Sequence, residues 1–181
     1  MGQDMVWVSV SNDRTTEHLR LDAGPAGFRA NGLVVGRFDG LPLRLRYTLD
    51  IADDWTVGSL RADLEGGAGL DLDSDRRGNW HGTDGMQLET LEGCLDVDIQ
   101  ATPFTNTLPI RRLGLEVGGS REISVVYIPM PSLVPRRAQQ KYTRLGPDKY
   151  LFEGLETGFR AVLQVDDQGL VLEYTGLFRR V

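Results

Sequence analysis

The feature that most constrains this chain is a strict alternation of apolar and polar positions over residues 41–51. Every odd position in this segment is Leu, Tyr or Ile, and the positions between them are polar, charged or proline. Side chains that alternate with a period of two point to opposite faces of a β-strand. A strand with one buried face and one wet face is typical of an antiparallel sheet. The pattern therefore predicts a half-buried antiparallel strand over 41–51.

Similar alternation recurs along the chain, over 55–64, 70–73, 95–99, 113–117, 123–127, 150–152, 159–165 and 170–174. In the first of these segments the apolar positions change phase at Gly58, which predicts a β-bulge there. Turn sequences separate the segments, at 39–40, 65–67, 77–78, 118–119 and 166–169. About a dozen or more strands at ~10-residue spacing predict an all-β fold. Neither a linker nor a repeat divides the chain, so we expect a single domain spanning 1–181.

Helix is scarce in this pattern, and two stretches compete for it. One begins at Thr102 as N-cap, has Pro103 at the first helical position, and runs towards Arg112 with a kink or restart at Pro109. The other is 135–145, where apolar residues fall on one helical face. We expect the first to be the main helix.

Composition excludes several classes of protein. The chain of 181 residues carries 20 basic and 26 acidic side chains, a net charge of −6, which argues against nucleic-acid binding. No apolar run approaches the ~18 residues that a membrane span needs, and the N-terminus has no secretory signal pattern. The lone Cys94 forms no internal disulfide. We therefore expect a cytoplasmic protein with no nucleic-acid partner and no transmembrane span; its oligomeric state is not predicted.

The sequence contains fragments of metal-binding and catalytic motifs, but none of these motifs is complete. Asp71, Asp73 and Asp75 open a calcium-loop spacing, but the glycine and glutamate that such a loop needs later are missing. The two histidines give no zinc-ligand spacing. Cys94 is expected to be a buried, inert thiol and His18 to be exposed. The sequence therefore predicts no metal and no cofactor.

The densest unusual stretch is 94–113, which gathers acids, prolines, threonines, an asparagine and two arginines around one strand end. Asp96 and Asp98 lie two apart on a strand, so both carboxylates project from one face. Arg111 and Arg112 are candidate bidentate partners for them. On residue chemistry alone, a rigid corner held by an ion pair and a polar binding site remain equally open.

This stretch resembles the signature of a bacterial glycolipid-binding family, long catalogued as a domain of unknown function. The match is specific at 96–98 and 102–113, and it extends more loosely over nearly the whole chain. The looser matching positions are Gly32, Gly36, Tyr47, Trp55, Gly78, Trp80, Gly93, Cys94, Tyr127, Tyr142, Tyr150 and the 165–174 segment. The resemblance implies a spiral β-roll, a many-stranded antiparallel sheet curled around a single helix, similar to periplasmic carriers of lipoprotein acyl chains.

The resemblance also implies non-catalytic binding of an amphipathic, lipid-like ligand such as a glycolipid, in a cleft between sheet and helix. An acyl chain would contact apolar residues and a sugar would contact polar and aromatic ones. The predicted ligand-binding residues are Asp96, Asp98, Asn106, Arg111, Arg112, Trp80, Tyr127 and Tyr142. The alternative is a hydrolase that acts on a sugar-like substrate through the Asp96/Asp98 pair. A third interpretation makes the motif a fold corner only.

Overall fold

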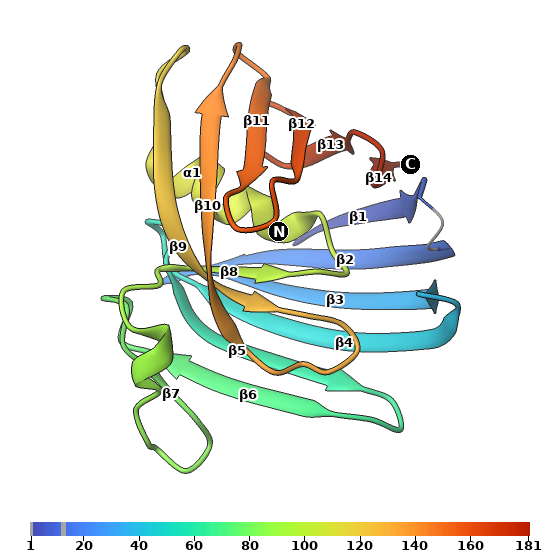
Figure 1. Cartoon of the computed structure of the whole chain (residues 1–181), viewed down its shortest axis with the longest axis vertical. Coiled ribbons are helices and arrows are strands. Elements are labelled where there is room, and N and C mark those ends of the chain that lie inside the picture. Colours follow the sequence, from blue (N-terminus) through green and yellow to red (C-terminus); the bar gives the residue numbers. More distant parts are fainter. Residues whose placement is uncertain (1, 12–13) are drawn as a thin grey trace.

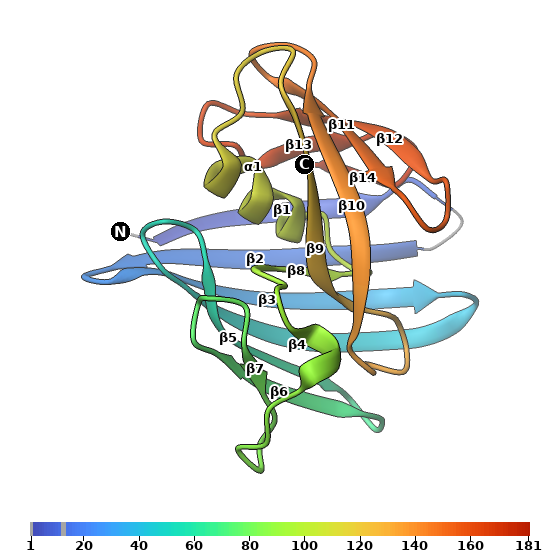
Figure 2. The same cartoon turned by 60° about the vertical axis from the view of Figure 1, so that its left-hand side comes forward.

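A single curled sheet makes up most of the molecule in this computed structural model, which describes residues 2–11 and 14–181. Within this part of the chain the sheet has fourteen strands, and it wraps around one short α-helix (Figures 1 and 2). The strands are β1 (Gly2–Ser9), β2 (Arg14–Gly24), β3 (Gly27–Phe38), β4 (Leu41–Ile51), β5 (Val57–Leu64), β6 (Gly69–Ser74), β7 (Trp80–His81), β8 (Asp96–Ile99), β9 (Ser120–Ile128), β10 (Arg136–Arg144), β11 (Lys149–Gly154), β12 (Arg160–Val165), β13 (Val171–Tyr174) and β14 (Phe178–Arg180). The prediction of a mainly β protein, with its sheet curled as a spiral roll around a helix, is confirmed.

The order of the strands brings the two ends of the chain together. The sheet runs β7-β6-β5-β4-β3-β2-β1-β14-β13-β12-β11-β10-β9-β8. The first and last strands therefore pair with each other in the middle of the sheet, with Trp7 opposite Arg180. At one edge β8 pairs with β9, and this is the parallel pairing in an otherwise antiparallel sheet.

The alternating segment at 41–51 forms β4 with the predicted bounds. Its odd positions from Leu43 to Ile51 are buried, whereas Arg44 and Arg46 are exposed. In the pairing with β5, Asp50 lies opposite Ser59 and Ile51 opposite Val57. Gly58 is thus the extra residue of a bulge, as its sequence position predicts.

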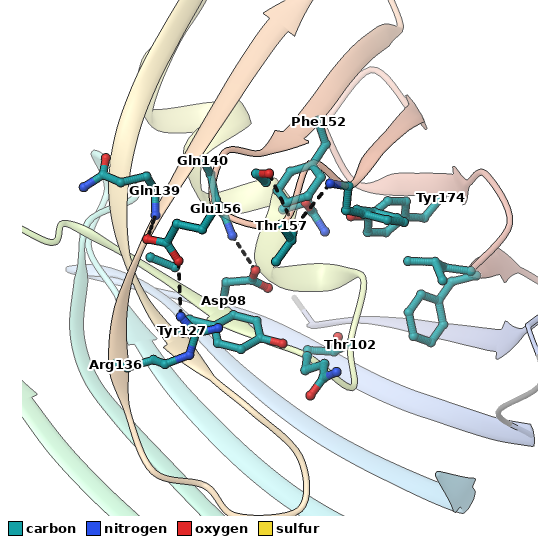
Figure 3. A pocket seen from close by; sticks show the side chains of 17 residues that line it. Asp98, Thr102, Tyr127, Arg136, Gln139, Gln140, Phe152, Glu156, Thr157 and Tyr174 are labelled. Carbon is teal, nitrogen blue, oxygen red and sulfur yellow. Dashed lines mark hydrogen bonds and ion pairs between the residues drawn. The ribbon is translucent and has the colours of Figure 1, made fainter. Parts of the chain in front are cut away.

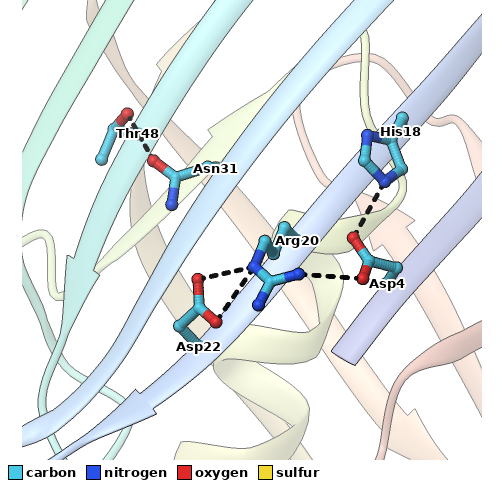
Figure 4. Close-up of polar contacts among 6 residues, drawn as sticks. All are labelled: Asp4, His18, Arg20, Asp22, Asn31 and Thr48. Carbon is cyan, nitrogen blue, oxygen red and sulfur yellow. Dashed lines mark hydrogen bonds and ion pairs between the residues drawn. The ribbon is translucent and has the colours of Figure 1, made fainter. Parts of the chain in front are cut away.

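The outward face of the first strands is polar, as Figure 4 shows. Arg20 donates hydrogen bonds to both Asp4 and Asp22, at 3.1 Å. His18 is exposed and lies 2.9 Å from Asp4, so its predicted surface position is confirmed. Across β3 and β4, the Thr48 hydroxyl donates to the Asn31 side chain at 3.1 Å. This face of the sheet is therefore exposed to solvent, and the apolar face lines the inside of the roll.

The helical segment lies inside the curl (Figure 2). A 3₁₀ turn over Phe104–Asn106 leads into α1, Thr107–Leu113. The hydroxyl of Thr102 accepts a hydrogen bond from the Phe104 amide at 3.0 Å, so Thr102 starts the segment as predicted. Pro109 lies in the first turn of α1, where proline is tolerated, and the helix continues through it to Leu113 without the predicted restart. Gly114 ends the helix with φ 53°, in the left-handed region.

Two secondary-structure predictions are wrong. Residues 136–144 of the second candidate helix form strand β10. The alternating residues at 113–117 form no strand, because Leu113 ends α1 and the chain then turns before β9. A 3₁₀ turn at Glu89–Leu91 also precedes β8.

The core is formed by the inner face of the sheet and the buried side of the helical segment. Its largest fully buried side chains include Trp7, Trp80 and Phe104. Cys94 has no exposed surface, and burial raises the pKa of its thiol to about 11. The predicted burial of Cys94 is therefore confirmed, and the raised pKa favours the protonated thiol at neutral pH.

Candidate functional site

A cavity of about 340 Å³ lies between the helical segment and the C-terminal half of the sheet. Its walls come from β8 to β11, from β13 and β14, from the turn between β11 and β12, and from the segment just before α1, and Figure 3 shows its lining side chains. These elements are far apart in the sequence, and only the curl of the sheet brings them together. The cavity combines a polar floor, an aromatic wall and a partly charged rim.

Asp98 on β8 is the centre of the polar floor (Figure 3). Gln140 donates from Nε2 to the Asp98 carboxylate at 2.5 Å, and the Thr105 hydroxyl donates at 3.3 Å. Burial raises the pKa of Asp98, although both hydrogen bonds act against that shift. Behind the floor, the Tyr142 hydroxyl donates to Oδ1 of Asn106 at 2.8 Å. These contacts fix the position of the carboxylate.

Aromatic rings form the wall of the cavity. Phe152 on β11 and Tyr174 on β13 pack edge to face with their centroids 6.0 Å apart. Phe159 lies 6.1 Å from Phe152, and Phe178 lies 6.5 Å from Tyr174. Tyr127 is the cross-strand neighbour of Asp98, and in the view of Figure 3 Asp98 lies between Tyr127 and Phe152. A flat apolar or ring-shaped group would meet an aromatic surface here.

The rim of the cavity mixes one ion pair with an exposed apolar side chain. Arg136 donates to Glu156 at 3.3 Å, and its guanidinium lies 4.7 Å from the centroid of the Tyr127 ring. Glu156 also accepts from the Gln139 amide at 3.2 Å. Phe159 also lines the cavity and is 41% exposed. The entrance is therefore amphipathic.

Asp96 does not line this cavity, although it shares a strand with Asp98. It is fully buried, and Arg112 on α1 donates to both of its carboxylate oxygens, at 3.0 and 2.5 Å. Burial raises the pKa of Asp96, and the guanidinium acts against that shift. The prediction that Arg112 reaches this strand face is confirmed, and the pair ties the helix to β8.

The other predicted residues lie elsewhere. Arg111 stacks over the Trp55 ring at 5.1 Å and lines a separate cavity beside it. Trp80 is fully buried and donates from Nε1 to the Cys94 carbonyl at 2.8 Å. Tyr142 lies behind the floor. Among the predicted ligand contacts, only Asp98, Asn106 and Tyr127 line the main cavity, and a ligand role for each predicted residue stays a prediction.

Several lining residues escaped the sequence analysis. Gln140, Phe152, Phe159 and Tyr174 come from strands β10 to β13 or the turn before β12. Alternation places Phe152 and Tyr174 on an inward face, but nothing in a single sequence states that these faces meet Asp98. That information lies in the order of the strands.

A third buried carboxyl, after Asp98 and Asp96, belongs to Glu17. Glu17 on β2 is 2% exposed and accepts hydrogen bonds from the Tyr47 and Thr102 hydroxyls, the latter at 2.6 Å. Burial raises the pKa of Glu17 to about 7, against the lowering effect of both hydroxyls. Thr102 lines the cavity, so the network connects this carboxyl to its wall.

The chain is similar to known proteins over nearly its whole length. Residues 4–180 match the family described as "Putative glycolipid-binding". The chain belongs to this family. It is also similar to the crystal structure of a DUF1089 family protein from Pseudomonas aeruginosa, with 44% sequence identity, a TM-score of 0.86 and 94% of each chain covered. No curated protein matches the chain.

Two further observations bear on the class of site. Over residues 2–11 and 14–181, no cluster of three or more His, Cys, Asp or Glu side chains is placed to hold a metal ion. In the same part of the chain no helix has the length and apolar character of a membrane span.

Proposed function

We propose that the main cavity binds the polar head of an amphipathic, lipid-like ligand, with a glycolipid as the leading class, and that it does so without catalysis. The observation that carries this proposal is the placement of Asp98 and Gln140 against an aromatic wall in a cavity of about 340 Å³. Small-molecule sites usually have this form, an apolar or aromatic hollow with a few convergent polar groups. The name of the family supports the same class of ligand.

The parts of the cavity suit the parts of such a ligand. The faces of Phe152 and Tyr174 accept the C–H face of a sugar ring, and the oxygens of Asp98 accept its hydroxyl donors. The exposed side chain of Phe159 lies at the rim, where an acyl chain would leave the cavity. We also propose that the protein is cytoplasmic, and this part of the proposal rests on the sequence alone.

The hydrolase alternative gains no support from the structure. A glycosidase needs two carboxyls facing one substrate. Asp98 lines the cavity, but Asp96 is fully buried and bound by Arg112 outside it. The second carboxyl at the cavity, Glu156, is held by Arg136 at the rim.

The test is to identify what travels with the protein. The chain is purified from bacteria without detergent, and bound molecules are detected by native mass spectrometry and identified after extraction. We expect a glycolipid or related amphiphile with wild type, and a loss of at least about tenfold in bound fraction with Phe159→Ala, because a stacking ring is removed.

The matched control is Leu41→Ala, which removes another exposed apolar side chain that does not line the cavity. This variant should retain the bound molecule. A wild-type protein that carries no amphiphile, and that binds none when alkyl glycosides are added, would contradict the proposal.

A further inference from the structure

Asp98 differs from Asp96 on the same strand and from Glu156 at the rim because no basic side chain pairs with it. Asp96, two residues away, is bound by Arg112, and Glu156 is bound by Arg136. Over the described residues 2–11 and 14–181, no Arg, Lys or His nitrogen lies within 4.0 Å of the Asp98 carboxylate. Its partners there are the uncharged donors Gln140 and Thr105. A carboxyl group without a basic partner therefore faces the cavity.

A buried carboxylate without a counterion is unfavourable, so such a group either holds a proton or pairs with a cation. A carboxylate offers about four acceptor positions, and two are used here by protein donors. The side chain also lines the cavity, so the remaining positions are open to a ligand. A group in the cavity that both donates hydrogen bonds and carries positive charge would complete the set.

The rings around Asp98 favour the same charge. Aromatic faces attract cations within about 6 Å of the ring centroid. Arg136 already occupies one face of Tyr127. Within the described part of the chain, no basic side chain stacks on Phe152, Phe159, Tyr174 or Phe178. The wall therefore presents aromatic rings without a cation partner beside a carboxyl group without one.

We propose that the head bound in the main cavity carries a protonated amine, which pairs with Asp98 and lies against the Phe152 and Tyr174 rings. This inference rests on the proposed function, since it specifies the head of the same amphiphile. An amino sugar and a simple ammonium head share the required chemistry. A phosphate, sulfate or carboxylate head would be repelled by Asp98.

The experiment compares three amphiphiles with the same eight-carbon chain, namely octylammonium, octyl glucoside and octyl sulfate. Each is titrated below its micelle concentration into the full chain at neutral pH, and the heat of binding is measured. For wild type we expect octylammonium to bind about tenfold or more tightly than octyl glucoside, because a charge-assisted bond is added, and octyl sulfate to bind most weakly.

The decisive variant is Asp98→Asn, which keeps the size of the side chain and removes its charge. Gln140 can turn its amide to keep a hydrogen bond to the new side chain. Octylammonium should lose about tenfold or more in affinity, while octyl glucoside should change by less than about threefold. The matched control is Glu65→Gln, which removes an exposed carboxylate that is paired with Arg44 away from the cavity and should keep the preference for ammonium.

The outcomes separate the two proposals. Equal binding of octylammonium and octyl glucoside by wild type, or a preference for octyl sulfate, would overturn the amine assignment and leave the lipid-binding function standing. An ammonium preference that survives in Asp98→Asn would also overturn it. Failure of all three amphiphiles to bind would remove the proposed function, and the amine assignment with it. The fold of each variant is checked by circular dichroism.

Discussion

A single buried residue, Glu17, is expected to make the stability of this fold depend on pH. It lies on the inner face of β2, is 2% exposed and has hydroxyl partners, and within residues 2–11 and 14–181 no basic side chain pairs with it. Burial raises its pKa from 4.5 to about 7. The native state therefore binds a proton there over a pH range in which the unfolded chain has released it.

The consequence for stability has a definite sign. Because the native state holds more protons than the unfolded state between pH 4.5 and about 7, the free energy of unfolding falls as the pH rises through this range. The total loss is about 3 kcal/mol. Glu17→Gln stays neutral at every pH, so we expect it to remove this slope and to be more stable than wild type at pH 8. Urea unfolding at pH 5, 6, 7 and 8 measures both effects.

Glu65→Gln is the control for Glu17, since Glu65 is exposed and paired with Arg44. It should keep the wild-type slope between pH 5 and 8. An equal slope in wild type and Glu17→Gln would show that Glu17 does not titrate in this range.

At the scale of elements, Gly32 and Tyr47 explain how β3 and β4 reach Glu17. The two residues are direct cross-strand partners, and a Cβ at Gly32 would overlap the Tyr47 ring. The absence of a side chain at Gly32 lets the ring lie across β3 and place its hydroxyl on Glu17 of β2. A glycine inside a strand often marks such a close approach.

Gly32→Ala should therefore destabilise the protein by about 1–3 kcal/mol, because the ring must leave its place in a packed core. Chemical denaturation measures the loss. Gly24→Ala is the matched control, since a Cβ at that end of β2 would meet only a carbonyl oxygen at 3.8 Å. A stability for Gly32→Ala equal to that of Gly24→Ala would contradict the steric argument.

The Asp96–Arg112 ion pair is a second contact between elements, and it joins α1 to the edge strand β8. Arg112→Met leaves the fully buried Asp96 carboxylate unpaired, and we expect a loss of about 3–5 kcal/mol in the free energy of unfolding. Arg29→Met breaks a similar two-bond pair with Asp50 on the exposed face, and it should cost less than about 1 kcal/mol. Thermal and urea unfolding of both variants give the comparison.

The double variant Asp96→Asn with Arg112→Met refines this prediction. The double variant has no unpaired carboxylate at position 96, so it should be more stable than Arg112→Met alone. If the two exhibit equal stability, an unpaired carboxylate is not the cause of the loss.

These elements also show what a single sequence reveals and what it hides. The segment 41–51 was predictable because its inner residues are all apolar. In β10 the inward residues are Ala138, Gln140 and Tyr142, and the polar Gln140 is buried because it binds Asp98. That polar inward residue masks the alternation, and the spacing of Ala138 and Tyr142 fits a helix equally well.

In the candidate site, too, the sequence predicts some of the residues and misses others. Asp98 and Asn106 stood out because they lie in one dense stretch of the sequence. The wall of Phe152, Phe159 and Tyr174 did not, because its residues meet Asp98 only through the curl of the sheet, and pairing order is not written in the local pattern. The resemblance to a family predicted the roll, and strand alternation alone predicted only a mainly β chain.

At the scale of the whole molecule, the sheet has a seam. Strands β1 to β7 form one half and β8 to β14 the other, and within the sheet the halves meet only where β1 pairs with β14. Backbone hydrogen bonds from Val181 to Val6 and from Val10 to Leu177, at 2.9 and 2.8 Å, extend this short pairing. The cavity lies in the second half, so its walls depend on the seam for their place against β1 and β2.

Trp7 strengthens the seam. It is fully buried on β1 and donates from Nε1 to the Val171 carbonyl on β13 at 2.8 Å, beyond the intervening β14. Trp7→Phe removes this donor and leaves a buried carbonyl without it, so we expect a loss of about 2 kcal/mol in the free energy of unfolding. Native-state hydrogen exchange should also show faster exchange of the β1 and β14 amides, because the halves separate locally before the whole chain unfolds.

Trp80 provides a control with the same burial and the same type of bond. It is fully buried and donates to the Cys94 carbonyl at 2.8 Å, but it lies on β7 at the edge of the sheet. Trp80→Phe should cost a similar amount in global stability and leave the protection of the β1 and β14 amides close to its wild-type pattern. If both variants open the seam equally, the two halves unfold as one unit, and the β1–β14 pairing is no weaker than the rest of the sheet.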